Sequence, residues 1–211
     1  MFSLDAPSTR FYMACAVAGL DALHGAGWMH RDLASKNVVI ANNGYAKIID
    51  CGLAKRVKEG EKTYTTCGTP IYIAPEVIKQ AGYGHQSEVW TLGVMLHELF
   101  SGMLPFFVPK SCTAQGNARR MELYKAILKM EPAMDALCFS SKGADLYGPD
   151  FPLATQHLIR QLLAKKAADR ITLPLVRTHP FFHGFDWAAF HANTMPPPVV
   201  PERDPALPEP R

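Results

Sequence analysis

The spacing of apolar residues along the chain predicts a mainly helical protein. Residues 10–24 are amphipathic with a helical period, and residues 89–100 are apolar on nearly every side, as expected for a buried helix. Residues 119–130 and 154–165 also have the period of amphipathic helices. The first ten residues, which include a Pro and a Ser, are expected to form a loop. The segments expected to be irregular are 102–118 and 131–153.

One short β-hairpin is the extended structure that the pattern predicts. Residues 38–41 and 45–49 are β-branched or aromatic runs, and the Asn-Asn-Gly between them favours a tight turn with positive φ. Residues 50–75 carry turn residues and hydroxyls without a helical period, so we expect a long ordered loop, which is usually functional. After Phe190 the chain is rich in proline, which predicts an extended tail on the surface.

The composition is that of an ordinary globular domain. Of the 211 residues, 48% are hydrophobic and 19% are charged, which is enough to bury a core. The net charge is +3 without a Lys/Arg run, so we expect no nucleic-acid binding. The five Cys form no C-x-x-C pair and none has metal-ligand spacing to a His, which favours a reduced protein without disulfides or zinc.

Three motifs follow one another and are specific in combination. They are "HRDLASKN" at residues 30–37, "DCG" at 50–52 and "CGTPIYIAPE" at 67–76, with the predicted hairpin between the first two. With these motifs the chain resembles the C-terminal lobe of a eukaryotic protein kinase. "AKRVKEGEKTYTTCGTP" and "HPFFHGFDWAAFHANTMPPPVVP" are similar to the AGC group, above all to cyclic-GMP-dependent and then cyclic-AMP-dependent kinases. The resemblance runs from Thr9 to Pro201.

The resemblance implies roles for four residues in phosphoryl transfer. Asp32 matches the catalytic aspartate that accepts the proton of the substrate hydroxyl. Asn37 and Asp50 match the two ligands of the Mg²⁺ that accompanies ATP, and both offer the hard oxygen atoms that Mg²⁺ prefers. Thr69 matches the threonine that hydrogen-bonds the catalytic aspartate. The alternative is that the two Asp are only turn and cap residues.

The resemblance also implies a regulatory site and a structural ion pair. Thr65 matches the phosphorylation position, to be modified by an activating kinase or by autophosphorylation, with Arg31 and Lys55 as its cationic partners. Glu76 and Arg170 match an ion pair that we assign to the fold rather than to catalysis.

The chain departs from the kinase pattern at the catalytic loop and the metal-binding turn. Ala34 replaces the Lys that meets the transferred phosphate, and Lys36, two residues later, is a candidate to supply that charge. The alternative for Lys36 is a solvated surface residue. Cys51 stands where the family has a large aromatic residue, and Glu88 replaces an Asp that braces the catalytic loop.

The substrate groove also departs from the AGC pattern. Kinases of this group read basic substrates through several carboxylates, of which Glu98 remains as the predicted substrate-binding residue. Lys36 and Ile71 replace two others, so a strong preference for arginine is not expected.

Two interpretations of residues 10–20 ("RFYMACAVAGL") are open. The stretch has a leading Arg, an uncharged run and small residues, as in a secretory signal peptide. We favour the helix, because signal cleavage would remove part of the catalytic module. No apolar run reaches the ~18 residues of a membrane span. We therefore expect an intracellular, cytoplasmic protein.

The parts that hold ATP in kinases are not found before His30. There is no G-x-G-x-x-G loop, no strand Lys in a V-A-I-K-like context and no helix Glu to pair with it. We therefore expect residues 1–183 to be a truncated catalytic domain with only the C-terminal lobe. Residues 184–211 would be an AGC-type C-terminal extension, partly disordered. A cyclic-nucleotide regulatory domain, if one exists, would lie outside this chain.

Two functions fit these observations. The first is the catalytic portion of a serine/threonine protein kinase, which transfers the γ-phosphate of ATP to a protein substrate. The alternative is a non-catalytic binding module, a lone kinase lobe that docks a partner. An unrelated class, such as a metal hydrolase using His and Asp, has no support in the spacing of those residues.

Overall fold

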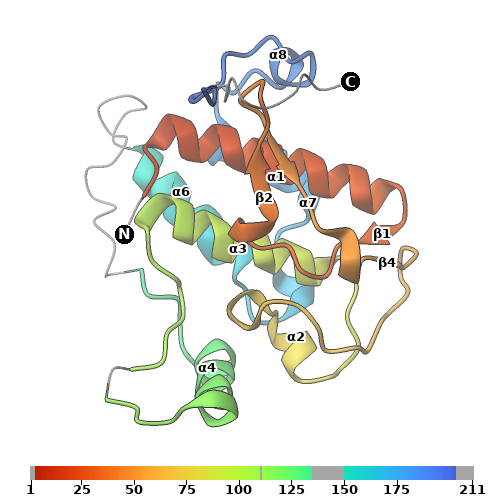
Figure 1. The fold of residues 1–211 in the computed structure, drawn as a ribbon, viewed down its shortest axis with the longest axis vertical. Coiled ribbons are helices and arrows are strands. Elements are labelled where there is room, and N and C mark those ends of the chain that lie inside the picture. The colour runs from red at the N-terminus through yellow and green to blue at the C-terminus, as the bar shows by residue number, and fades with distance from the viewer. Residues whose placement is uncertain (1–2, 110, 135–149, 203–211) are drawn as a thin grey trace.

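The computed structural model describes residues 3–109, 111–134 and 150–202 of the chain. Helices α1 (Ala6–Gly25) and α3 (Gln86–Ser101) pack against each other at the centre of the molecule, and α6 (Asp150–Leu162) packs on α3. Figure 1 shows α4 (Gly116–Lys129) at one end of the molecule and α8 (Trp187–His191) at the opposite end. The fold is mainly α, as the sequence pattern predicts.

Helix α1 begins at Ala6, several residues earlier than predicted. The Asp5 carboxylate caps the helix by accepting a hydrogen bond from the Ser8 amide at 2.8 Å. Pro7 lies in the first turn, where its missing N–H has no helical partner to lose. The prediction of a loop over the first ten residues is therefore wrong, because the Pro and Ser that suggested a loop are residues that start the helix.

Helix α3 is buried on nearly every side, which confirms the predicted buried helix. Trp90, Leu92 and Leu96 are fully enclosed, and each such side chain stabilises the fold by about 1.5–3 kcal/mol. A Cβ atom added to Gly93 would lie 2.8 Å from Leu162 Cβ, so the glycine lets α3 and α6 approach closely. This rigid helix carries Glu88 and Glu98 toward the motif residues.

The predicted hairpin is present. Strand β2 (Val38–Ile40) pairs antiparallel with β3 (Ala46–Ile48), and Val39 lies opposite Lys47. Gly44 in the connecting turn has φ = 79°, the left-handed backbone that the Asn-Asn-Gly sequence favours.

A second two-stranded sheet was not predicted. Strand β1 (Trp28–Met29) pairs antiparallel with β4 (Lys55–Arg56), and each has only two residues. Strand β4 lies inside the segment 50–75, so the prediction of an uninterrupted loop there is wrong at this point. Such short strands leave no periodic pattern in the sequence. Their pairing joins the start of the motif region to the segment that carries Thr65.

The remaining elements are close to their predicted bounds or too short to predict. Helices α4 and α6 begin before the predicted 119 and 154 and end before the predicted 130 and 165. Much of the segment 131–153, predicted to be irregular, lies outside the described residues. The short elements are α2 (Pro75–Ile78), α7 (Leu173–Thr178) and single 3₁₀ turns at Ser35–Asn37, Cys51–Leu53, Pro70–Tyr72, Ala167–Asp169 and Pro180–Phe182.

The proline-rich tail packs over the hairpin for as far as it is described. The Tyr45 hydroxyl donates to the Met195 carbonyl at 2.9 Å, and the rings of Tyr45 and Phe190 lie 5.4 Å apart. A Cβ atom on Gly44 would lie 2.5 Å from the Val199 carbonyl oxygen, so the tail crosses close over the turn. The tail forms no helix or strand from residue 193 to residue 202. Residues 203–211, part of the stretch expected to be partly disordered, lie outside the described residues.

The cysteines of the described chain are free thiols, namely Cys15, Cys51, Cys67 and Cys112. Burial raises the pKa of the Cys15 thiol to about 11. No cluster of three or more His, Cys, Asp or Glu side chains in the described ranges is placed to hold a metal ion. None of the helices in the part of the chain that the structure describes is long and apolar enough to span a membrane.

Candidate active site

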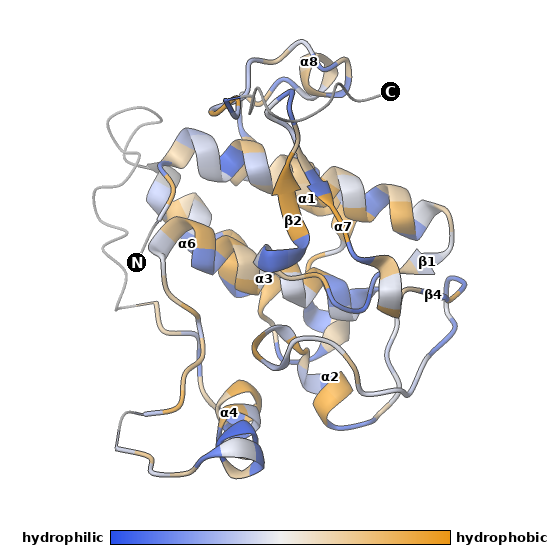
Figure 2. Cartoon of the chain, in the orientation of Figure 1, coloured by the Kyte–Doolittle hydropathy of each residue, from blue (hydrophilic) through white to orange (hydrophobic). Residues whose placement is uncertain are grey.

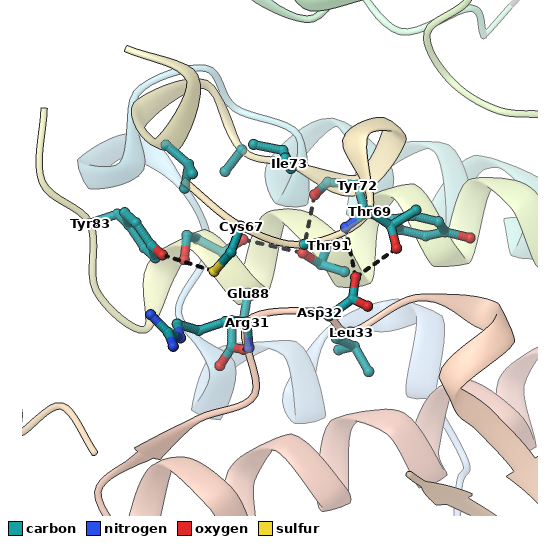
Figure 3. A pocket seen from close by; sticks show the side chains of 14 residues that line it. Arg31, Asp32, Leu33, Cys67, Thr69, Tyr72, Ile73, Tyr83, Glu88 and Thr91 are labelled. Atoms are coloured by element: carbon teal, nitrogen blue, oxygen red, sulfur yellow. Dashed lines mark hydrogen bonds between the residues drawn. The ribbon is translucent and has the colours of Figure 1, made fainter. Parts of the chain in front are cut away.

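The carboxylate of Asp32 lies where two segments meet. We call residues 30–37, which include Asp32, the catalytic loop, and residues 50–76 the activation segment. Its Oδ1 accepts two hydrogen bonds from Thr69, from the amide and from the hydroxyl, both at 2.6 Å (Figure 3). Asn37 Nδ2 donates to Asp32 Oδ2 at 3.1 Å and to the Asp32 carbonyl at 2.7 Å. The carboxylate is thus held from both sides by this chain.

Several donors keep the Asp32 carboxylate ionised. Burial alone would raise its pKa, but the hydroxyl and amide of Thr69, the Lys36 ammonium and the Asn37 amide together lower the pKa below the ordinary value. Lys36 Nζ lies 3.5 Å from Asp32 Oδ2, while the Lys36 side chain is 62% exposed. Lys36 therefore belongs to the site and also reaches solvent.

The hairpin brings Asn37 near Asp50. The Ile49 amide donates to the Asn37 carbonyl at 2.9 Å, one step beyond the last paired residues of β2 and β3. Asp50 follows Ile49, so both predicted metal ligands lie at the same open end of the hairpin. Because Asn37 uses its amide nitrogen on Asp32, its amide oxygen is the atom left for a cation. An amide oxygen and a carboxylate at one edge fit Mg²⁺, which prefers oxygen ligands.

Asp50 is held far less firmly than Asp32. It is exposed, its backbone is left-handed with φ = 62°, and its Oδ1 accepts a hydrogen bond from the Gly52 amide at 3.3 Å. Cys51, in the place of the family's aromatic residue, is exposed as well. The turn is therefore shaped mostly by its own backbone.

Glu88 braces the catalytic loop from below. Its Oε1 accepts a hydrogen bond from the Arg31 amide at 2.6 Å, and its Oε2 lies 2.6 Å from His24 Nε2. Arg31 has a left-handed backbone with φ = 66°, which is uncommon for a residue with a side chain and needs such support. The extra methylene of Glu relative to Asp thus leaves this brace in place.

The predicted phosphosite residues lie in one region but are bonded elsewhere. The Thr65 side chain is exposed, and its carbonyl accepts a hydrogen bond from the Tyr83 hydroxyl at 2.6 Å. Arg31 Nε donates to the Leu53 carbonyl at 2.6 Å. Lys55 Nζ donates to the hydroxyl of Thr63, not of Thr65, at 3.1 Å.

The pKa of Tyr83 is raised to about 12, chiefly by burial, whereas the Arg31 charge acts in the opposite direction. This electrostatic effect of Arg31 on Tyr83, together with the hydrogen bond from Tyr83, links Arg31 indirectly to the Thr65 backbone.

Glu98 connects three segments of the fold. Its Oε2 accepts hydrogen bonds from Ser35 Oγ at 2.5 Å and from the Tyr72 hydroxyl. The Tyr72 hydroxyl also contacts Ser35 Oγ at 3.0 Å. Burial and the neighbouring Glu98 raise the pKa of Tyr72, so this tyrosine stays protonated as a donor. The predicted substrate-binding carboxylate thus has two partners within the protein.

The predicted partners Glu76 and Arg170 form a bidentate ion pair. Arg170 Nη1 and Nη2 donate to the two carboxylate oxygens at 2.7 and 2.8 Å, and the Arg170 side chain is fully buried. Arg170 also donates to the carbonyls of Gln86 and Ala164. The pair ties the end of the activation segment to the core.

Several residues that position the site were not predicted from the sequence. His30 is fully buried, and it contacts the Ile49 carbonyl at 2.9 Å and accepts from the Asp32 amide at 3.3 Å, so it joins the catalytic loop to the metal-binding turn. Ser35, Tyr72 and Tyr83 were also not assigned roles. His30, Ser35 and Tyr72 stand inside the quoted motifs, so the motifs could have indicated them, whereas Tyr83 lies outside the motifs and its bond to Thr65 depends on the fold.

An aspartate held by a threonine, beside an asparagine and a second aspartate at a hairpin end, is the arrangement expected of a kinase-type C-terminal lobe. The family model of the protein kinase domain matches residues 2–182, and the chain belongs to this family.

Among curated proteins, the chain is similar to the cGMP-dependent protein kinase egl-4 of Caenorhabditis elegans, with 34% identity over 203 residues, 94% of this chain and 24% of that protein. It is 32% identical over 205 residues to the human cGMP-dependent protein kinase 2, covering 95% of this chain and 24% of that protein. A RAC family serine/threonine-protein kinase homolog of Dictyostelium discoideum is 34% identical over 195 residues, 91% of this chain and 39% of that protein. The chain thus spans about a quarter of the length of the first two relatives.

Proposed function

We propose that this chain is the catalytic portion of a serine/threonine protein kinase that transfers the γ-phosphate of ATP to protein Ser or Thr hydroxyls. The observation that carries the proposal is the Asp32 carboxylate, ionised and fixed by Thr69 and Asn37. Within this proposal, residues 1–183 contribute the catalytic lobe and 184–211 the C-terminal extension.

In the proposed reaction, Asp32 orients the substrate hydroxyl and accepts its proton as the hydroxyl oxygen bonds to the γ-phosphorus. The bond between the γ-phosphorus and the β,γ-bridging oxygen breaks at the same time, and ADP leaves. Thr69 holds the carboxylate in place through its amide and hydroxyl, and Asn37 and Asp50 would hold Mg²⁺ with their oxygens. When bound, Mg²⁺ neutralises charge on the phosphate oxygens. Lys36 lies close enough to Asp32 to contact the transferred phosphate and to replace the charge that Ala34 lacks.

Regulation is proposed at Thr65. A phosphate on this exposed side chain would attract Arg31 and Lys55 away from the Leu53 carbonyl and the Thr63 hydroxyl, because ion pairs with phosphate are stronger than those neutral contacts. The activation segment would then be ordered around the phosphate. We also propose that the protein acts on a protein substrate in the cytoplasm and that a cyclic-nucleotide domain outside this chain regulates it.

The test is phosphate transfer from labelled ATP by the full-length native protein that carries this chain, purified from its own cells. We expect transfer to Ser/Thr peptides with the wild-type protein and a loss of about 10²–10⁴-fold with Asp32→Ala. Lys36→Ala should lower turnover if Lys36 meets the phosphate, and unchanged turnover would assign it to the solvated surface. A wild-type protein without transfer to any Ser/Thr peptide would refute the proposal.

The alternative is a non-catalytic binding module. The exposed Cys51 and the missing cation at Ala34 favour it, since the metal-binding turn lacks its usual packing. Binding of magnesium-ATP separates the two functions. A kinase portion should bind magnesium-ATP when a kinase N-terminal lobe is added, whereas a binding module should not respond to that addition.

A further inference from the structure

A pocket of about 370 Å³ lies between the activation segment and α4. One wall is formed by Pro70 and Ile71, which directly follow the Thr69 that holds Asp32. The opposite wall comes from α4 and from the segment that leads to it, and the packing of α4 against the turn at Pro70–Tyr72 fixes the two walls relative to each other. The pocket thus begins at the residues that directly follow Thr69 in the chain.

The walls of this pocket are apolar and partly open to solvent. Phe107 is 51% exposed, and Leu104 and Leu123 are only partly buried. Figure 2 shows that α4 has hydrophobic residues as well as a strongly hydrophilic stretch. An exposed apolar surface of this kind beside a binding site is typical of a place where a partner's side chain is buried.

The charges around the pocket have one sign. Among the described residues that line it, the charged ones are Arg119 and Arg120, both exposed on α4. Lys36, whose side chain is 62% exposed, adds a third cation at the candidate active site. A bound segment would therefore meet positive charge at the pocket, and a segment that also reaches Asp32 would meet it again at Lys36.

The carboxylates that would attract a basic substrate are missing or occupied. The apolar side chain of Ile71 stands in the pocket wall where an acidic residue would attract arginine. The remaining carboxylate, Glu98, accepts hydrogen bonds from Ser35 and Tyr72 through Oε2. A basic segment would gain little from these groups and would be repelled by the cations.

We propose that this pocket selects the protein substrate, by burying an apolar side chain that acidic residues flank. The apolar side chain fits against Ile71 and Phe107, and the flanking Asp or Glu residues face Arg119 and Arg120. The proposal rests on the proposed kinase function and gives it a substrate class: acidic segments with an apolar anchor, rather than segments rich in arginine.

The first test is the binding of fluorescein-labelled peptides to the 211-residue chain at low salt, measured by fluorescence anisotropy. Three matched peptides carry one Ser: the first has a Leu flanked by Glu, the second has Arg in place of each Glu, and the third has Ala in place of Leu. We expect the first peptide to bind about tenfold more tightly than either of the others. Equal or tighter binding of the Arg peptide would overturn the proposal.

The second test uses matched charge reversals on α4. Arg120→Glu should weaken binding of the Glu-flanked peptide by about three- to tenfold, and added salt should reduce this difference. Lys129→Glu changes the net charge equally at an exposed residue of the same helix that does not line the pocket, so it should have less than about a twofold effect. Equal losses from the two variants would mean unspecific attraction and would overturn the proposal.

The apolar contact is tested separately. Phe107→Ser removes a half-exposed ring and Ile71→Glu restores a carboxylate; thermal melting of each variant shows whether it still folds. Both should weaken the Leu peptide relative to the Ala peptide, and Ile71→Glu should improve binding of the Arg peptide. If folded variants leave the preference for Leu unchanged, the anchor does not lie in this pocket.

Phosphate transfer by the full-length protein separates the two proposals. Preferred binding and preferred phosphorylation of the Glu-flanked Leu peptide support both. Preferred phosphorylation of the Arg peptide keeps the kinase function and overturns the substrate class. Preferred binding without any transfer keeps the pocket as a docking site and refutes the kinase function.

Discussion

The catalytic loop and the metal-binding turn lie at opposite sides of one hairpin end, yet the chain holds them very differently. Asp32 is 12% exposed and accepts hydrogen bonds from Thr69 and Asn37. Asp50 is exposed and accepts one from the Gly52 amide, at 3.3 Å. Both carboxylates belong to kinase-like motifs of the same chain. They differ because Asp32 is bonded by a distant segment as well as by its own loop, whereas Asp50 is bonded by its own turn.

The two carboxylates therefore differ in how firmly the surrounding chain holds them. Asp32, which we propose acts on the substrate hydroxyl, is set in place by hydrogen bonds from Thr69 and Asn37. Asp50, which we propose as a metal ligand, is followed by the exposed Cys51. We therefore expect the turn at Asp50 to be less protected from exchange with solvent than the backbone around Asp32.

The largest expected effect comes from cutting the tie between the activation segment and the core. Arg170→Ala leaves the Glu76 carboxylate and two carbonyl acceptors without their donor, and we expect a loss of about 3–5 kcal/mol in the free energy of unfolding. Urea unfolding followed by circular dichroism measures it. A loss below about 1 kcal/mol would mean that the segment keeps its place without the pair.

Replacing each aspartate tests the comparison itself. Asp32→Ala leaves the Thr69 amide and hydroxyl without their acceptor and should cost about 2–3 kcal/mol of unfolding free energy. Asp50→Asn keeps a residue that tolerates the left-handed backbone and should cost less than about 0.5 kcal/mol. Equal costs in urea unfolding would remove the distinction between the two regions.

Removing the Thr69 hydroxyl should mainly change the pKa of the Asp32 carboxyl. Thr69→Val deletes one donor to Asp32 at a cost of about 1 kcal/mol and should raise the pKa of the carboxyl. Because the native pKa is lowered, its contribution to stability is present above the unfolded pKa and is lost as the pH falls through the folded pKa. The acid limb of kcat/KM for the full-length protein should therefore move to higher pH, and a Thr69→Ser control should leave it in place.

The smallest expected effect is a pH dependence of the free energy of unfolding that comes from a pair of histidines outside the candidate site. Nδ1 of His157 lies 2.9 Å from Nε2 of His179, and burial, followed by the His157 charge, lowers the pKa of His179 to about 4. An unfolded His binds its proton near pH 6.5, so the free energy of unfolding should fall as the pH drops from about 6.5 to about 4.

His179→Gln should remove most of this slope, as measured by urea unfolding over that pH range. The contribution of Asp32 is lost mainly below the unfolded pKa of an Asp, about 3.9, so the slope nearer pH 6 distinguishes His179 from Asp32. A slope that persists in His179→Gln would assign the acid sensitivity to other groups.

The long elements could be predicted from the sequence because their signals are local, and the motifs likewise indicated the candidate site residues, whose roles stay predictions. The apolar run of α3 and the Asn-Asn-Gly turn are visible in short windows, and the three motifs carry Asp32 and Asp50 in fixed order. The prediction from sequence was wrong where a residue type is compatible with more than one kind of structure or where an element is very short. Pro7 starts α1 although it suggested a loop, and the two-residue strands β1 and β4 exist only through pairing across the fold.

The partners of charged side chains were the hardest part to predict. Lys55 bonds Thr63 rather than Thr65, and Glu98 is occupied by Ser35 and Tyr72. These choices depend on which groups the packed helices bring within about 3 Å, and no spacing in the sequence records that.

The most direct measurement of the central claim is amide hydrogen exchange in the 211-residue chain without ligand. The amides of Thr69, bonded to Asp32 at 2.6 Å, and of Asn37, bonded to Ala34 at 2.8 Å, should exchange slowly. The Gly52 amide, bonded to Asp50 at 3.3 Å on an exposed turn, should exchange orders of magnitude faster. Comparable protection at Thr69 and Gly52 would contradict the account, because the two halves of the site would then be equally formed by this chain alone.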